Sequence, residues 1–266
     1  MADKAKSPIE VVQGLLKGGA VPDNLNRGIS MVVYGDPGVG KTTLATTLPP
    51  KETLIINTEA GIGAILGKGH TIIPMEDNLQ KLDFIYQTLR TNPVPYVVLD
   101  NISELEQWMI NVLTKGRKKD FVELKEYGDS SYKMREYIRL FRDLVFVGTT
   151  VIFNAWELPI EIQVSGGEVK TKAFPKLSKK LAIELCGLVD VVGRLERYPK
   201  TGDRFLRLDG TNEIEAKSAF KILDNEGKQV KFWEANLPSL LEAIYAHDYS
   251  DVDCTIPTDA LKKGAK

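Results

Sequence analysis

Short runs of apolar residues recur along the chain without the polar alternation of a strand that has one face in solvent. They are rich in β-branched residues, and such runs are typical of parallel strands covered on both faces. The five runs are Ile29–Tyr34, Thr53–Asn57, Thr71–Met75, Tyr96–Asp100 and Val151–Trp156.

Apolar residues recur at helical spacing between these runs. The spacing predicts helices over Asp77–Arg90, Ile102–Thr114 and Ser130–Val147. Asp77 is the expected N-cap of the first helix, and Ser103 with Glu106 is the expected capping box of the second. Because strands and helices alternate, we predict an α/β fold with a doubly wound, mostly parallel sheet.

The pattern changes after the fifth run. Residues Leu158–Pro175 are polar and contain a Ser-Gly-Gly sequence, which predicts a long loop or a loose hairpin. The later segments are predicted, in order, to be a helix, the two strands of an antiparallel hairpin and a last helix: Ser178–Leu188, Asp190–Tyr198, Arg204–Leu208 and Asn236–His247.

We therefore expect one core over residues 28–247, preceded by an N-terminal extension over 1–27. Residues 248–266 have little to bury and are expected to form a flexible tail. A chain of 266 residues is long enough for one large α/β core.

The net charge and the small numbers of cysteine and histidine residues exclude several classes of protein and of site. With 35 basic and 36 acidic side chains the net charge is −1, which excludes a protein that coats nucleic acid through a global positive charge. Two cysteines and two histidines do not provide a disulfide framework or a zinc site. The sequence has no apolar signal core and no membrane-spanning run, so we expect a cytoplasmic protein without a membrane partner.

One motif points directly to chemistry. Gly35-Asp36-Pro37-Gly38-Val39-Gly40-Lys41-Thr42 matches the phosphate-loop pattern G-x-x-x-x-G-K-[ST], between an apolar strand and a helix predicted over Lys41–Leu48. Glycines let successive N–H groups turn toward phosphate oxygens, and a helix N-terminus adds positive charge. We expect Gly35–Thr43 to bind ATP, with Lys41 at the β- and γ-phosphates and Thr42 on Mg²⁺.

Three polar residues lie at the ends of predicted strands. Asp100 has the position of a Walker B acid that holds Mg²⁺, although a helix cap is the alternative. Glu59 is either a general base facing the ligand crevice or a first-turn residue that stabilises a helix dipole. Asn154 either senses the γ-phosphate and positions water or simply begins a loop.

A basic strip follows the last apolar run. Its members are Lys170, Lys172, Phe174, Lys176, Lys179 and Lys180. Lysines track a phosphate backbone and an aromatic ring stacks on a base, so single-stranded DNA is the expected partner, with a solvated loop as the alternative. A second basic cluster, Lys115–Lys119, follows a predicted helix, whose C-terminus favours cations in any case.

From about Gly28 to Leu223 the chain resembles the RecA-like core of phage AAA-family nucleotide-binding proteins, which include the short Sak-type recombinases of single-strand annealing. The resemblance depends on four motifs in order and on the segments that follow them. The motifs are Gly35–Thr42, Asn57–Glu59, Val97–Asp100 and Val151–Asn154, and the resemblance continues through Leu188–Val192, the hairpin and Glu215–Lys217.

The resemblance implies ATP and Mg²⁺ as cofactors and a homo-oligomer, either a ring or a filament. It implies that Glu59 is the catalytic base, that Asn154 begins the polar sensor turn and that Lys217 reaches the nucleotide of a neighbouring subunit. Two positions depart from RecA. Asn101 replaces a Ser after the Walker B acid, and the turn after Asn154 lacks the Gln that links ATP to DNA.

We therefore predict a Mg²⁺-dependent ATPase that acts in phage DNA recombination or annealing, with a single-strand-binding protein as a further partner. Two alternatives stay open. One is a non-catalytic ATP-binding module that controls assembly, and the other is a small-molecule kinase. A kinase needs an acceptor pocket and usually an Arg-bearing lid, for which the sequence offers no convincing candidate.

Overall fold

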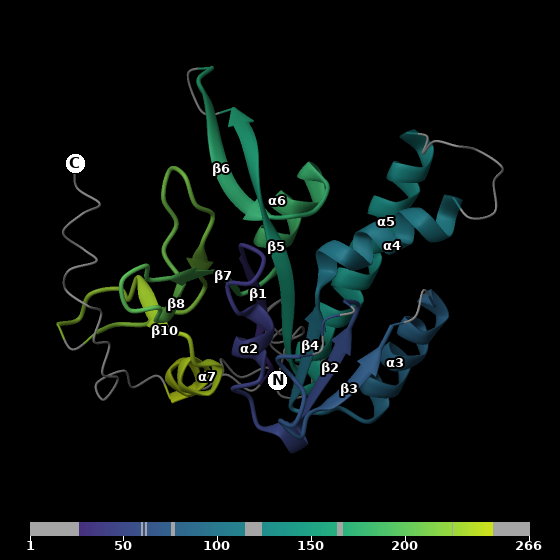
Figure 1. Cartoon of the computed structure of the whole chain (residues 1–266), viewed down its shortest axis with the longest axis horizontal. Helices are drawn as coiled ribbons and strands as arrows, with labels where there is room; N and C mark the ends of the chain where they lie inside the picture. The colour runs from purple at the N-terminus through teal and green to yellow at the C-terminus, as the bar shows by residue number, and fades with distance from the viewer. Residues whose placement is uncertain are drawn as a thin grey trace, which may run out of the picture.

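The computed structural model describes residues 27–59, 61, 63–75, 78–114, 124–163, 167–224 and 226–246. Within these ranges a sheet runs through the molecule in the order β10-β8-β7-β1-β5-β4-β2-β3, while β6 pairs with β5 and β9 pairs with β7 (Figure 1). The strands are β1 (Ser30–Gly35), β2 (Thr53–Asn57), β3 (Thr71–Pro74), β4 (Tyr96–Asp100), β5 (Thr150–Gln163), β6 (Val169–Pro175), β7 (Val191–Arg197), β8 (Arg204–Arg207), β9 (Lys217–Ser218) and β10 (Phe232–Glu234).

Helices lie on both faces of this sheet. The α-helices are α2 (Lys41–Ala45), α3 (Leu79–Thr91), α4 (Ile102–Thr114), α5 (Leu124–Arg142), α6 (Lys179–Leu188) and α7 (Leu237–Ala246), and the two 3₁₀ helices are η1 (Pro50–Glu52) and η2 (Asp143–Val147). The row from β7 to β3 is parallel, and β8 and β10 continue it in antiparallel order. The predicted fold class is therefore confirmed, and the strand order is consistent with the predicted RecA-like core.

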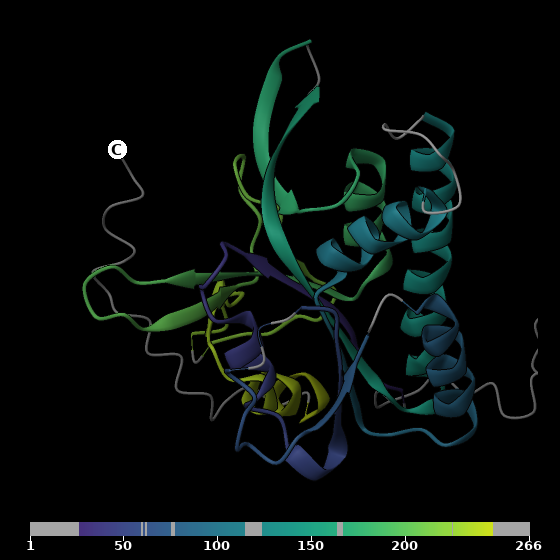
Figure 2. The same ribbon diagram turned by 45° about the vertical axis from the view of Figure 1, so that its right-hand side comes forward.

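The strands divide their side chains between two cores. Along β5, Val151 and Phe153 point into a core with α3, α4, α5 and α6, whereas Ile152 points into a core with α2 and α7. Figures 1 and 2 show these two helix groups on opposite sides of the sheet. Because the central strands β1, β2 and β4 and the first half of β5 are buried on both faces, continuous apolar runs are required there, as the sequence pattern predicted, whereas β3 at the edge of the sheet is partly exposed.

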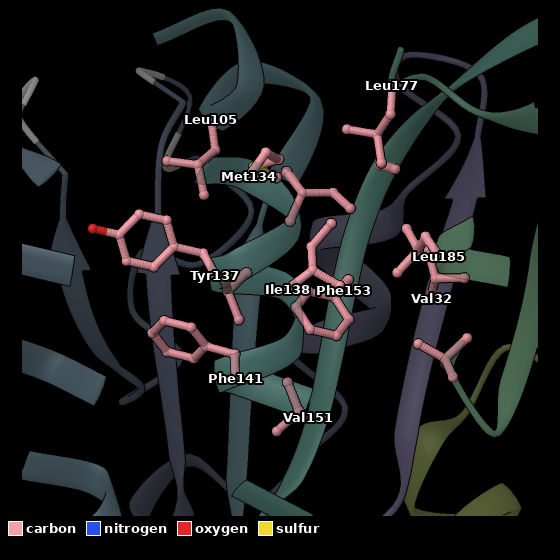
Figure 3. Packing of buried hydrophobic residues seen from close by; sticks show 14 of the residues in the cluster. Val32, Leu105, Met134, Tyr137, Ile138, Phe141, Val151, Phe153, Leu177 and Leu185 are labelled. Carbon is pink, nitrogen blue, oxygen red and sulfur yellow. The ribbon is translucent and has the colours of Figure 1, made fainter. Parts of the chain in front are cut away.

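The first core is centred on the contact between α5 and β5. Figure 3 shows the apolar face of α5 directed at the strand, with the residues Met134, Tyr137, Ile138, Phe141, Val151 and Phe153. Each of these side chains is almost completely buried. This packing fixes β5 in the sheet between β1 and β4.

Of the two alternatives predicted for Leu158–Pro175, a long loop or a loose hairpin, the structure has the hairpin. Strand β5 continues to Gln163 and pairs in antiparallel register with β6, so the two strands form a hairpin that projects from the sheet (Figures 1 and 2). Ile160 and Phe174 are buried at its base, which anchors the hairpin despite its polar composition.

Two predicted helix caps differ from the structure. The side chain of Asn78 accepts the Lys81 N–H and caps α3, while the predicted cap Asp77 lies outside the described residues. Helix α4 is capped by Asn101, whose Oδ1 accepts the Glu104 N–H at 2.9 Å. The predicted capping box is wrong because its residues have other partners: Ser103 accepts from Trp156 N, and Glu106 accepts from Ser178 N.

Several predictions concern residues outside the described ranges. These are the extension before Arg27, the tail over 248–266 and the basic cluster Lys115–Lys119. The predicted domain boundaries stay predictions. Among the described residues, no helix combines the length and the apolar character that crossing a bilayer requires.

Replacing Phe153 by Ala is expected to lower the free energy of unfolding by about 3–5 kcal/mol, because it opens a cavity between α5 and the sheet. Phe146→Ala is the matched control, since the Phe146 side chain in η2 is 73% exposed and its loss should cost less than about 0.5 kcal/mol. Urea unfolding of the two variants measures both values. Equal destabilisation would contradict the assignment of the core.

Candidate nucleotide-binding site

Three polar residues form one row across neighbouring parallel strands, at the carboxyl ends of β2 and β4 but within β5, which continues to Gln163 and so, contrary to the prediction, does not end at Asn154. Asn57 of β2 pairs in register with Asp100 of β4, and Asp100 pairs with Asn154 of β5. All three are almost completely buried. Since residues two positions earlier on these strands pack into the core that contains α2, the row faces the loop that leads into α2. This is the edge at which parallel α/β sheets bind ligands.

The phosphate loop closes around the lysine of its own motif. Gly38 and Gly40 have φ angles of 78° and 107°, which favour glycine. The Lys41 side chain is 6% exposed, and its Nζ donates to the carbonyls of Gly35 at 2.9 Å and Asp36 at 3.0 Å. Burial lowers the pKa of Lys41, although Asp100 and Glu59 oppose this shift. The ammonium is thus held inside the loop.

Helix α2 is shorter than predicted. It ends at Ala45 instead of Leu48 and contains 5 residues, so its macrodipole contributes less to anion binding than a full helix would. The first-turn amides of Lys41, Thr42 and Thr43 still lack a partner in a preceding turn. The capacity to bind phosphate therefore depends mainly on these amides and on the Lys41 charge.

The two predicted metal ligands lie in direct contact. Thr42 Oγ1 donates to Asp100 Oδ2 at 2.7 Å, and Asn154 Nδ2 donates to Asp100 Oδ1 at 3.1 Å. Both carboxylate oxygens of Asp100 are therefore oriented by neighbouring side chains. A hydroxyl and a carboxylate supply the hard oxygen ligands that Mg²⁺ prefers, so this pair fits that ion.

A second set of contacts places Glu59 beside Asp100. Thr58 Oγ1 donates to the Asn101 carbonyl at 2.7 Å and accepts the Asn101 N–H at 2.9 Å, which joins the ends of β2 and β4. Asn101 Nδ2 donates to Glu59 Oε1, and Asn57 Nδ2 donates to the Glu59 carbonyl at 2.6 Å. Asn101 therefore both caps α4 and orients the Glu59 carboxylate.

The environment of Glu59 favours the protonated form of its carboxyl group more than an aqueous environment would. Burial raises the pKa of Glu59, and the negative charge of Asp100 raises it further. Lys41 and a hydrogen bond with Trp156 oppose this shift. A carboxylate with a raised pKa is a stronger base toward water, which suits a group that must accept a proton.

The other predicted catalytic residues have different surroundings. The amide of Asn154 contacts Asp100, so it orients the carboxylate that is predicted to bind the metal, while its own contact with a phosphate stays a prediction. Lys217 is on β9, paired with Val192 of β7, and its Nζ lies 3.5 Å from the Gly187 carbonyl. A role of Lys217 in a neighbouring subunit's site stays a prediction.

Most of the predicted basic strip has partners within the chain. Lys172 pairs with Glu215 at 2.7 Å, and Lys170 lies 3.5 Å from Glu168. The other contacts are those of Lys176 with the Trp156 ring and of Lys179 with the Glu161 carbonyl, whereas Lys180 is exposed.

The role predicted for Phe174 is wrong. Its ring is 4% exposed and belongs to the core at the base of the hairpin, so it does not present a face to a base. Phe174 lies on the face of β6 that packs into the core, where it fills space between the hairpin and the sheet.

Three contributors to the site were not predicted. Trp156 is two residues after Asn154 on the same strand, so alternation alone would have placed it on the site face. Asn101 directly follows Asp100, and the sequence alone gives it no role. Arg204 donates from Nε to the carbonyl of Val39 in the loop at 2.7 Å, and this contact spans 165 positions, which no local pattern reveals.

Comparison with solved structures gives two similar folds. The first is the crystal structure of the RadB recombinase. Its sequence is 17% identical to this chain, the alignment covers 74% of this chain and 84% of that chain, and the TM-score is 0.43. The flagellar accessory protein FlaH from Methanocaldococcus jannaschii is 13% identical over 76% of this chain and 84% of that chain, with a TM-score of 0.39.

No match is found among curated protein sequences. The family model of the AAA domain named AAA_24 matches residues 27–220, which contain the phosphate loop, Glu59, Asp100 and Asn154. Because this match spans most of the sequence, the chain belongs to that AAA domain family.

Proposed function

We propose that the protein binds ATP with Mg²⁺ at the phosphate loop and hydrolyses it, and that it acts on single-stranded DNA in recombination or annealing. The observation that carries the proposal is the convergence of Lys41, Thr42, Asp100 and Glu59 at one edge of the sheet. A phosphate-binding cation, two metal ligands and a candidate base are all required for hydrolysis of a nucleoside triphosphate.

Phosphate binding requires groups that carry positive charge or donate hydrogen bonds. The loop amides and Lys41 provide both, and Lys41 is already directed into the loop by the carbonyls of Gly35 and Asp36. When phosphate oxygens are present, the ammonium exchanges neutral carbonyl partners for charged ones, which form stronger hydrogen bonds.

Thr42 and Asp100 would hold Mg²⁺, which when bound neutralises charge on the phosphate oxygens. Asn154 restricts the Asp100 carboxylate to one orientation, because its amide donates to the oxygen that Thr42 does not contact. We infer that this restriction maintains the metal ligands in position before the nucleotide arrives.

Glu59 is the proposed general base. Asn101 orients its carboxylate, and its pKa is raised by burial and by Asp100. In the reaction Glu59 accepts a proton from the attacking water, and the oxygen of that water forms the new bond to the γ-phosphorus as the bond to the β-phosphate oxygen breaks.

We further propose that another subunit completes the site. Lys217 lies outside its own site, on an antiparallel strand next to β7. In a ring or filament of identical subunits, Lys217 would approach the γ-phosphate of a neighbour and stabilise charge that develops in the transition state.

Strand β5 connects the nucleotide site with the hairpin that is proposed to contact DNA. It begins in the core, carries Asn154 at the site and continues without a break to Gln163 in the projecting hairpin. The lysines with partners in the chain contribute less free charge than the sequence suggested, so we assign DNA contact to the hairpin as a whole together with the exposed Lys180 at the start of α6.

Glu59→Gln is expected to retain ATP affinity and to lose turnover by about 10²-fold or more, because the amide cannot accept the proton of the attacking water. Glu52→Gln is the matched control, since Glu52 is an exposed carboxylate at the opposite end of β2. The measurement is phosphate release with and without single-stranded DNA. Full turnover by Glu59→Gln would place the base elsewhere, and no turnover by the wild-type protein would favour the non-catalytic module.

Turnover should depend on pH through Glu59. Since burial and Asp100 raise its pKa, activity should fall on acidification at a pH above the ordinary carboxyl value of about 4.3. The hydrogen bond from Trp156 lowers the pKa, so Trp156→Phe should raise it and move the acidic limb of the pH–rate profile to higher pH. Trp108→Phe in α4 is the control, and an unmoved limb in Trp156→Phe would contradict the assignment.

A further inference from the structure

The hairpin of β7 and β8 packs directly against the phosphate loop (Figures 1 and 2). A Cβ atom on Gly35 would lie 2.7 Å from the Leu195 carbonyl of β7, and one on Gly40 would lie 2.6 Å from Arg204 Nε of β8. Leu195 and Leu206 belong to the same core as the residues of α2. A side chain at either fixed glycine of the motif, Gly35 or Gly40, would thus clash with the hairpin, so the hairpin as well as phosphate requires glycine at both positions.

Arg204 contacts the loop with only one of its donors. Its Nε–H donates to the Val39 carbonyl at 2.7 Å. Within the described part of the chain, its terminal N–H groups form no hydrogen bond and no ion pair. An arginine has five N–H donors in a planar fork, so most of the donor capacity of Arg204 is unused.

Other arginines of the described ranges are placed differently. Six of them pair with a carboxylate: Arg27, Arg135, Arg139, Arg142, Arg194 and Arg207. Arg90 and Arg197 form no ion pair with any described residue but are exposed, so water solvates their charge. Arg204 differs from both groups, because it is only partly exposed and its charge has no carboxylate partner among the described residues.

We propose that Arg204 binds the phosphate chain of the nucleotide held by its own subunit, an inference that rests on the proposed function. The Nε–H contact with Val39 fixes the guanidinium at the loop, and the unused terminal N–H groups then donate to phosphate oxygens. Guanidinium groups match phosphate geometry, and a partly desolvated charge without a protein partner favours an anionic ligand. Arg204 would also link nucleotide binding to the β7–β8 hairpin.

The test compares dissociation constants of Mg-ATP and of Mg-tripolyphosphate by calorimetry. Arg204→Gln retains a donor but loses the charge, and it should weaken binding of both ligands by about 10-fold to 100-fold, the range for a lost charge-assisted hydrogen bond. Arg204→Lys should recover most of this loss. Arg90→Gln, which removes a charge from the end of α3, should bind both ligands as the wild-type protein does.

If the wild-type protein binds ATP, the proposed function stands, and three results would then overturn the proposal for Arg204. One is unchanged affinity in Arg204→Gln. Another is a lysine variant as weak as the glutamine variant, which would show that the Val39 contact and not the charge matters. The third is a loss confined to ATP, which would place Arg204 at the nucleoside. Absence of ATP binding by the wild-type protein would instead remove the proposed function itself.

Discussion

The carboxylate of Asp100 is the point on which the rest of the site depends. One oxygen accepts the Thr42 hydroxyl from the phosphate loop, and the other accepts the Asn154 amide from β5. The next residue, Asn101, holds Glu59 and caps α4. A buried carboxylate is stable only where hydrogen bonds replace its hydration, so the same contacts that permit Asp100 to be buried also assemble the site.

Sequence reasoning located those parts of the site that follow local rules. The phosphate loop, Asp100 and Glu59 each lie at the end of an apolar strand, and parallel strands bring such ends together. It did not locate Arg204, because that contact depends on how a distant hairpin folds back on the loop. It misassigned Phe174, because the polar composition of the segment conceals that Ile160 and Phe174 at the base of the hairpin are buried.

The site is joined to two peripheral hairpins, each by a different residue. Asn154 connects Asp100 with β5 and with the hairpin that carries the basic strip, whereas Arg204 connects the loop with the β7–β8 hairpin beside β10. Both connections run through hydrogen bonds to groups expected to change partners when a triphosphate and its metal ion bind. This arrangement suits a protein in which nucleotide state alters surfaces away from the site.

Titration of the protein with Mg-ATP, comparing wild type with Lys41→Met and Lys51→Met, tests the central assignment most directly. Lys41 is buried inside the loop, whereas Lys51 is exposed in η1. Loss of charge-assisted hydrogen bonds to phosphate predicts at least about 10²-fold weaker binding for Lys41→Met and unchanged binding for Lys51→Met. Equal affinity of a folded Lys41→Met variant and the wild-type protein would contradict the account.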